Sequence, residues 1–221
     1  CELSKKHARK TVALLSGNYA TDVDSLTAFD AIMLAPLGTK ATALAIADIL
    51  TGKYSPSGRL SSSMHRRADS VFAAHQQYLR TGMKVGRFMG YRYFDSAGVD
   101  VEFPFGHGLS YTTFEYGKAK VKNGKLIIPV KNTGSVAGDE VVQLYIRKPD
   151  DPKGPIKTLR GFERVTVAPG KTVKVEIPLT DETFNWWDET TQNVNPVHGT
   201  YELLYGGSSA DEALTSLTYI Y

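Results

Sequence analysis

The sequence predicts an α/β segment followed by an all-β sandwich, and three observations carry this prediction. Unbroken apolar runs and a helical pattern occupy the first 60 positions. Short runs with alternating apolar residues fill positions 114–221. Between these parts, positions 90–113 are rich in aromatic residues and glycines. Unbroken apolar runs are typical of strands buried on both faces, whereas alternation is typical of strands with one buried face.

The α/β segment contains two expected strands and one expected helix. Residues 11–16 (TVALLS) and 31–35 (AIMLA) have the composition of buried parallel strands. Residues 39–51 carry apolar side chains at helical spacing, and the pattern stops at Gly52. Two such strands cannot bury both faces of their own sheet. We therefore interpret residues 1–89 as the carboxy-terminal part of a larger, mostly parallel α/β sandwich domain, whose beginning we expect to lie outside this chain.

The next segments have weaker patterns. Residues 61–89 are expected to form a long connecting segment with weak periodicity, which includes a short helix around residues 71–79. Residues 90–113, GYRYFDSAGVDVEFPFGHGLSYTT, have neither a helical nor a strand period. We interpret this segment as a packed joint between two domains.

Residues 114–221 are expected to form a sandwich of seven short strands. The alternating runs are 118–121, 125–131, 140–147, 162–167, 172–179, 200–205 and 216–221. Turn signals such as Asn123-Gly124 and Ala168-Pro169-Gly170 separate them. The run 130–149, with its glycine-containing turn, indicates two antiparallel strands. This number and spacing of strands fits an immunoglobulin-like sandwich.

Composition excludes several classes of function. The formal net charge is only +3, with 26 basic and 23 acidic residues spread along the chain, so no nucleic-acid partner is expected. No run approaches the ~18 apolar residues that a membrane span requires. The single cysteine, Cys1, cannot form an internal disulfide or a thiolate metal site. Cys1 is either a lipid-modified residue or an arbitrary start, and we favour the second. The sequence is compatible with a cytoplasmic and with an exported location.

Several motifs, in the right order along the chain, resemble the carboxy-terminal part of glycoside hydrolase family 3 enzymes. ADILTGKYSPSGRL resembles the end of the family's α/β sandwich domain, after TVALLSGN and FDAIMLAPLG. GYRYFD and FPFGHGLSYT resemble the joint, and KNTGSVAGDEVVQLYI and LRGFERVTVAPG resemble a fibronectin type III-like domain. The resemblance implies an α/β part at 1–89, a joint at 90–113 and a fibronectin type III-like domain at 114–221.

The resemblance also implies where the chemistry lies. Such enzymes are retaining exo-glycosidases, in which an aspartate of an amino-terminal barrel is the nucleophile and, in many members, a glutamate of the α/β domain is the acid/base. The two carboxyl groups stand about 5 Å apart. Neither motif is present, so no catalytic residue is assigned to this chain. No cofactor is implied.

The carboxylates and histidines of this chain are not expected to replace that pair. The candidates by type are Asp139, Glu140, Glu163, Asp181, Glu182, Asp188 and Glu189. Each lies on or beside a sandwich strand or turn, where charged side chains usually face water. The five histidines have no paired ligand spacing, so no metal site is expected.

Aromatic residues are the remaining candidates. Tyr91 and Arg92 are the residues that we expect to border a substrate cleft, because arginine among aromatic side chains suits stacking or a buried hydrogen-bond network. Phe105, His107 and Tyr111 are expected to hold the joint. Trp186 and Trp187 could stack on sugar together with Tyr201 and Tyr205. Adjacent strand residues point to opposite faces, so we favour one tryptophan in the core and the other at a domain interface.

We favour the hypothesis that this chain is the carboxy-terminal portion of a β-glucosidase-like enzyme. In this hypothesis the chain supports the fold and shapes the substrate cleft. Its expected partners are a β-linked glycoside and the missing barrel and α/β portion, as a second chain or as the rest of the same gene product. The isolated chain is expected to be inactive. The alternative reading is a non-catalytic carbohydrate-binding or adhesion module.

Overall fold

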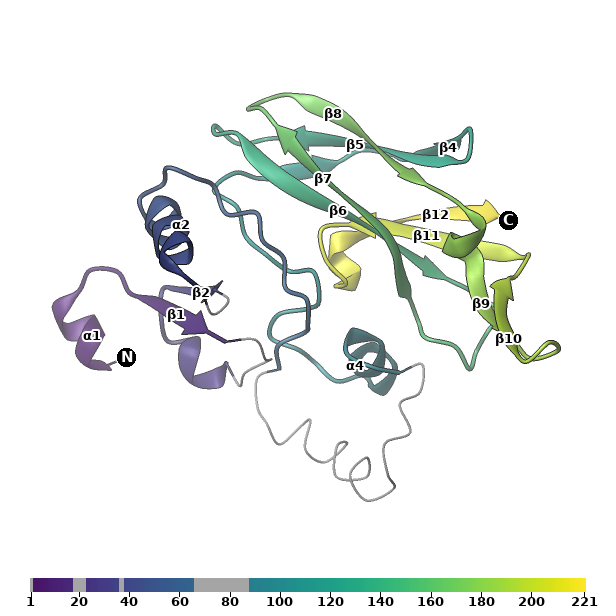
Figure 1. Cartoon of the computed structure of the whole chain (residues 1–221), viewed down its shortest axis with the longest axis horizontal. Coiled ribbons are helices and arrows are strands. Elements are labelled where there is room, and N and C mark those ends of the chain that lie inside the picture. Colours follow the sequence, from purple (N-terminus) through teal and green to yellow (C-terminus); the bar gives the residue numbers. More distant parts are fainter. Residues whose placement is uncertain (1, 18–22, 36–37, 66–87) are drawn as a thin grey trace, which may run out of the picture.

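The computed structural model describes residues 2–17, 23–35, 38–65 and 88–221 (Figure 1). A small α/β part lies on one side of the molecule, and a β-sandwich made by the second half of the chain lies on the other. This confirms the expected fold class. The short helix expected around residues 71–79 falls outside the described residues.

The α/β part contains one pair of parallel strands. Its elements are α1 (Glu2–His7), β1 (Val12–Ser16), a 3-10 turn (Asp24–Leu26), β2 (Ala31–Ala35) and α2 (Lys40–Leu50). Val12 pairs with Ala31, and Ser16 with Ala35. The Asp30 carboxylate accepts hydrogen bonds from Thr11 N at 2.8 Å and Thr11 Oγ1 at 2.9 Å, which lowers the pKa of Asp30 to about 2. This contact ties the starts of the two strands together.

The sandwich is built from two four-stranded antiparallel sheets. One sheet has the order β12-β11-β6-β7, and in the other β5 pairs with β3, β4 and β8. The strands are β3 (Phe114–Tyr116), β4 (Lys120–Lys122), β5 (Lys125–Asn132), β6 (Gly138–Arg147), β7 (Thr158–Val167), β8 (Thr172–Pro178), β11 (Thr200–Gly206) and β12 (Leu214–Ile220). A separate ribbon pairs β9 (Asn185–Asp188) with β10 (Asn193–Pro196).

Alternating side chains of the two sheets form the core. Leu126, Ile128 and Val130 of β5 are fully buried and belong to one cluster with Val142, Leu144 and Ile146 of β6. Strand β6 is also buried on its other face, where Tyr145 packs with Tyr91 and Leu204 in a second cluster. One face of β6 therefore meets the opposite sheet, and the other meets the joint.

The expected strands within 130–149 are present, but they do not pair with each other. β5 and β6 lie in different sheets, so the chain between them crosses the sandwich. The buried Asn132 holds this crossing. Its Nδ2 donates to Val136 O at 2.8 Å and Val167 O at 2.9 Å, and its Oδ1 accepts from Gly134 N at 3.0 Å. These bonds satisfy backbone groups of the crossing segment and of the end of β7.

The outer edge beside β5 is interrupted between β3 and β4, and Pro129 explains the break. Gly117 N donates to Pro129 O at 2.8 Å, so the nitrogen of Pro129, which has no proton, also faces this edge. A continuous edge strand would lack a donor there. The edge also carries exposed lysines at positions 118, 120 and 122.

Four elements of the joint and the sandwich differ from the sequence-based expectation. The joint, expected to lack a period, contains helix α4 (Tyr91–Ala97). Strands β9 and β10 were not predicted, because each has only four residues and neither alternates clearly. Strand β3 is likewise an addition to the seven expected runs, and it has only three residues.

Candidate functional site

The joint lies against both parts of the molecule through backbone hydrogen bonds. Leu60 N donates to His107 O at 2.9 Å, and Gly106 N donates to Leu60 O at 2.8 Å. Met64 and Phe103 form an antiparallel bridge with bonds of 2.8 and 3.1 Å. On the sandwich side, Ser209 N donates to Phe105 O at 2.8 Å. The joint is therefore hydrogen-bonded to the α/β part on one side and to the sandwich on the other.

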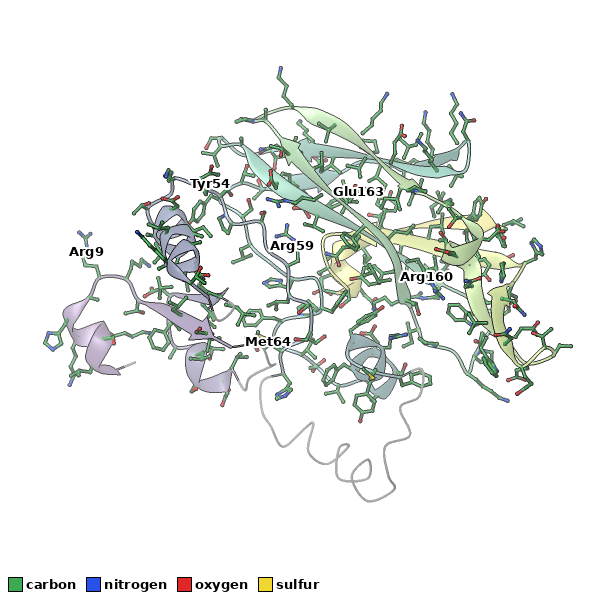
Figure 2. The ribbon with its side chains drawn as sticks, in the orientation of Figure 1. Arg9, Tyr54, Arg59, Met64, Arg160 and Glu163 are labelled. Carbon is green, nitrogen blue, oxygen red and sulfur yellow. The ribbon has the colours of Figure 1, made fainter. Side chains whose placement is uncertain are left out.

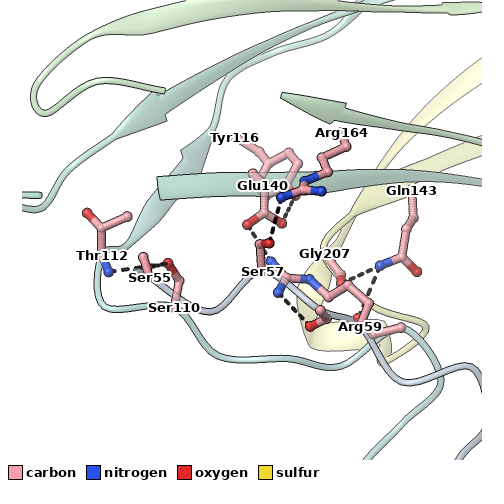
Figure 3. Close-up of polar contacts among 12 residues, drawn as sticks. Ser55, Ser57, Arg59, Ser110, Thr112, Tyr116, Glu140, Gln143, Arg164 and Gly207 are labelled. Atoms are coloured by element: carbon pink, nitrogen blue, oxygen red, sulfur yellow. Dashed lines mark hydrogen bonds and ion pairs between the residues drawn. The ribbon is translucent and has the colours of Figure 1, made fainter. Parts of the chain in front are cut away.

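Two glycines allow this close approach. Gly106 has a φ of 79°, and a Cβ atom there would lie 2.1 Å from Gln143 Oε1. Gln143 Nε2 donates to Gly106 O at 3.2 Å and to Gly207 O at 2.6 Å, so its amide occupies the space (Figure 3). A Cβ on Gly108 would lie 2.2 Å from Gly58 O. Larger residues at either position would separate the joint from its neighbours.

A buried ion pair lies at the centre of the junction. Arg59 comes from the segment after α2. It lies between the α/β part and the sandwich (Figure 2). Its guanidinium lies 2.7 Å from Glu140 Oε2, and the two side chains are only 10% and 6% exposed. Tyr116 donates its hydroxyl to Glu140 Oε1 at 2.8 Å. Glu140 is on β6 and Tyr116 on β3, so this network joins the α/β part to both sheets.

The expectation that Glu140 faces water is therefore wrong. Glu140 lies at a position of β6 that alternates in phase with the core residues Val142 and Leu144, which directs it into the sandwich. Burial raises the pKa of the Glu140 carboxyl, while the Arg59 charge opposes that rise. The same burial, together with the Glu140 charge, raises the pKa of Tyr116.

The other candidate carboxylates lie at the surface. Glu163, Asp181, Glu182 and Glu189 are exposed, and Asp139 and Asp188 are partly exposed. Asp139 pairs with Arg164, which also donates to Ser57 Oγ at 3.0 Å. Asp188 accepts hydrogen bonds from Thr190 and Thr191 within a turn. The contacts of Asp139 and Asp188 are structural.

Serine hydroxyls and Tyr111 add a second contact between the parts. The hydroxyls of Ser55 and Ser110 lie 2.8 Å apart, and Tyr111 N donates to Ser55 Oγ at 3.0 Å. The Tyr111 hydroxyl donates to Ile49 O, near the end of α2, at 2.7 Å. Tyr111 is 49% exposed, so this residue contributes mainly through its polar groups.

Helix α4 presents Tyr91 to the sandwich. The Tyr91 hydroxyl accepts a hydrogen bond from Leu159 N at 2.7 Å. Its ring stacks on Phe105 at 4.8 Å and meets Tyr145 edge-on at 5.8 Å. Burial is the main cause of the raised pKa of Tyr91. Tyr91 and Phe105 of the joint are thus brought together, and the contacts of Tyr91 with Leu159 and Tyr145 attach them to the sandwich.

A buried lysine holds the other end of α4. Lys157 is 2% exposed, and its ammonium lies 3.0 Å from Asp95 Oδ2 and 2.9 Å from Asp211 Oδ1. Burial raises the pKa of Asp95, although Lys157 opposes that rise. The helix ends at Gly98, which has a φ of 62° and donates to Asp95 O. Nothing in the sequence pattern signalled Lys157, because its partners lie far away along the chain.

Arg92 lies beside the Tyr91 contact. Its guanidinium carbon is 6.0 Å from the centre of the Tyr91 ring. Its buried Nε has no hydrogen-bond partner among the described residues. Arg92 is therefore the member of the predicted Tyr91–Arg92 pair that keeps an unused donor.

His107 packs by its ring. The imidazole stacks on Phe103 at 5.2 Å, and burial with the nearby Arg59 charge lowers the pKa of His107. The backbone of His107 bonds Leu60 and Pro104, as part of the joint.

The two tryptophans point to opposite faces of β9. Trp186 is 5% exposed and belongs to the sandwich core with Tyr201 and Tyr205. The hydroxyl of Tyr205 accepts from Ala119 N at 3.0 Å. Trp187 is 40% exposed. A position for Trp187 at a domain interface stays a prediction.

Within the described ranges, no group of three potential metal ligands occurs, and no helix is long and apolar enough to cross a membrane.

Comparison with protein families divides the chain in the same order as its structure. Residues 2–111 match the model described as glycosyl hydrolase family 3 C-terminal domain. Residues 140–209 match the fibronectin type III-like domain.

Related proteins extend these matches. A xylan 1,4-beta-xylosidase of Xylanibacter ruminicola is 44% identical over 86% of this chain and 21% of its own length. Thermostable beta-glucosidase B of Acetivibrio thermocellus is 35% identical over 92% of this chain and 28% of its own length. The chain therefore spans between a fifth and a third of the length of these relatives.

Solved structures that are similar to this chain include two β-glucosidases. A beta-glucosidase from Kluyveromyces marxianus superposes with a TM-score of 0.83 and 30% identity, covering 99% of this chain and 27% of that protein. Beta-glucosidase 3B from Thermotoga neapolitana gives a TM-score of 0.81 with 30% identity, covering 98% of this chain and 32% of that protein.

Proposed function

Because this chain belongs to glycoside hydrolase family 3, we propose that it forms the carboxy-terminal portion of a retaining, exo-acting β-glycosidase. The observation that carries the proposal is its similarity, over most of its length, to a β-xylosidase and to β-glucosidases. The substrate is a β-linked glycoside with glucose or xylose as the terminal sugar.

In this proposal the chain positions a cleft and does not perform the bond cleavage. Retaining hydrolysis needs a carboxylate nucleophile and a carboxylic acid about 5 Å apart. Glu140 is held by Arg59 and Tyr116, and Asp139 is held by Arg164. These side chains stabilise the junction, and the reacting carboxyl groups belong to a part of the enzyme outside this chain.

The feature that suits cleft shaping is helix α4. Tyr91 and Lys157 fix the helix on the sandwich, so the neighbouring Arg92 is carried by a rigid support. Arg92 is partly exposed, and we assign to its guanidinium a contact with a sugar hydroxyl. His107 and Phe105 act as positioning residues for the same segment.

The partner is the remainder of the enzyme, as a second chain or as the same polypeptide. Val12, Leu14 and Leu34 of the parallel strands are 44%, 51% and 42% exposed. Leu44 and Leu50 of α2 are 58% and 53% exposed. Parallel strands normally have both faces covered. The missing strands and helices of the α/β domain are the surfaces that fit here.

Hydrolysis of aryl β-glucosides and aryl β-xylosides tests the proposal. The isolated chain should have no turnover, whereas its complex with the barrel-containing portion should hydrolyse one or both. In that complex, Arg92→Ala should raise KM about tenfold, because one hydrogen bond to the substrate is lost. Arg9→Ala, a change at an exposed arginine far from α4, is the matched control.

Two results would contradict the proposal. Turnover by the purified chain, abolished by Glu163→Gln or Asp188→Asn, would place the active site within this chain. An unchanged KM for a correctly folded Arg92→Ala complex would remove Arg92 from the cleft.

A further inference from the structure

Trp187 lies on the outer face of the β9–β10 ribbon, away from the core. Its neighbour Trp186 is buried, whereas Trp187 is 40% exposed. Trp187 pairs with Val194 across the ribbon, and Val194 is 54% exposed. Directly paired residues share one face of an antiparallel pair. The ribbon thus displays an apolar surface at the end of the sandwich farthest from α2 (Figure 1).

A surface pocket of about 350 Å³ adjoins this indole. One wall is the loop after β6, with Lys148, Asp150 and Lys153. The other wall is the end of β9 and the following turn, with Trp187 and Glu189, and Val197 adds an apolar contact. A volume of this order accommodates a small ligand.

Polar contacts below the pocket hold both walls in place. The Asp151 carboxylate accepts the indole N–H of Trp186 and also Lys153 N at 3.2 Å. The guanidinium of Arg160 lies 5.7 Å from the Trp186 ring centre. On the opposite wall, Asp188 accepts from Thr190 N and Thr191 Oγ1, each at 2.8 Å. A preformed site loses less conformational entropy when a ligand binds.

The chemistry of the pocket selects a neutral, polyhydroxylated ligand. The Trp187 indole offers an apolar face to the C–H groups of a sugar ring. Carboxylates accept hydrogen bonds from hydroxyl groups, and lysine ammonium groups donate to them. The four carboxylates at 150, 151, 188 and 189 outnumber the lysines at 148 and 153, so the local net charge disfavours an anionic ligand.

We propose that the pocket beside Trp187 is a saccharide-binding site of the sandwich. The choice of a β-linked saccharide as its ligand rests on the proposed function. The indole stacks on one sugar ring, while Glu189, Asp150 and Lys153 contact hydroxyl groups at the rim.

The two tryptophans provide a direct probe, because Trp186 and Trp187 are the only tryptophans of the chain. Their two indole N–H signals in a ¹H–¹⁵N spectrum of the full chain are assigned with Trp187→Phe. Cellobiose and xylobiose are titrated, with maltose as the α-linked comparison. One of the β-linked disaccharides should shift the Trp187 signal saturably, with a dissociation constant in the millimolar range and much less movement of Trp186.

Variants distinguish stacking from a nonspecific effect. Trp187→Ala should weaken binding at least about tenfold, measured by calorimetry, because the aromatic contact is lost. Phe162→Ala removes another exposed aromatic side chain, 64% exposed on β7, and should leave the affinity unchanged. Equal affinities of Trp187→Ala and the unaltered chain would overturn the site, as would the absence of a saturable shift while the Trp186 signal shows a folded sandwich.

The complete enzyme separates this inference from the proposed function. Hydrolysis of an aryl β-glycoside without saccharide binding at Trp187 would overturn the site alone. Binding without hydrolysis would overturn the proposed function alone. Loss of acrylamide quenching of Trp187 on assembly would show that protein covers the indole and would also overturn the site.

Discussion

At the scale of single residues, the Arg59–Glu140 pair is the most consequential contact. It is buried, it joins segments 81 residues apart, and it links the α/β part to β6. A buried charge that loses its partner costs about 3–5 kcal/mol, more than an exposed pair contributes. The stability of the junction should therefore depend on the Arg59 charge.

Arg59→Met should lower the free energy of unfolding by about 3 kcal/mol at neutral pH, because Glu140 is left buried without a counter-charge. The pKa of Glu140 is already raised in the folded state, and the substitution raises it further. A raised folded-state pKa gives stability that is present below the unfolded pKa and is lost as the pH rises through the folded pKa. The decrease in unfolding free energy caused by Arg59→Met should therefore become smaller as the pH is lowered toward 4. Urea unfolding over this pH range measures it.

The matched control is Lys125→Met. Lys125 pairs with Glu176 at 2.8 Å, but both side chains are about half exposed. This variant should keep nearly the same unfolding midpoint at every pH. Adding Glu140→Gln to Arg59→Met should restore much of the lost stability. A cost that does not change with pH would contradict the assigned role of Glu140.

At the scale of elements, α4 depends on contacts outside itself. The helix has seven residues, too few for a stable isolated helix. Tyr91 and the Asp95–Lys157 pair supply the tertiary contacts that hold it.

Lys157→Met should release the end of α4, because Asp95 and Asp211 lose their shared cation. Hydrogen exchange at Gly98 and Val99, whose amides close the helix, should become about tenfold faster. The amides of β5 should keep their protection. Lys174→Met, at an exposed position of β8, serves as the control, and equal exchange in both variants would show that Lys157 does not hold the helix.

The same elements show what the sequence could predict. Strand β2 was predicted with its observed bounds, and α2 within one residue, because unbroken or helical apolar patterns are contained within the segment itself. Helix α4 was missed because aromatic contacts, and not its own periodicity, determine it. The burial of Glu140 was missed because its partner is distant in sequence. The order of the strands was also hidden, since Asn132 directs β5 and β6 into different sheets through hydrogen bonds of its side chain.

At the scale of the whole molecule, the two parts differ in how completely they bury their apolar residues. The sandwich has a closed cluster drawn from both sheets, whereas β1, β2 and α2 leave several large apolar side chains exposed. The first part therefore depends on a partner, and the second has its own core.

Residues 114–221 alone should fold cooperatively, as followed by circular dichroism during urea unfolding. They should be less stable than in the full chain, because removal of the joint uncovers Tyr145 and Leu204. Residues 1–60 alone should show no cooperative transition. An unfolded spectrum for 114–221 would contradict the predicted domain boundary.

The interrupted edge beside β5 also affects how copies of the sandwich behave at high concentration. An open edge strand can recruit a strand from another molecule and begin aggregation. Here the missing donor of Pro129 breaks the template, and the lysines at 118, 120 and 122 repel an identical edge. Salt screens such repulsion between exposed charges. The colloidal stability of the sandwich is therefore partly electrostatic, and low ionic strength favours its monomeric form.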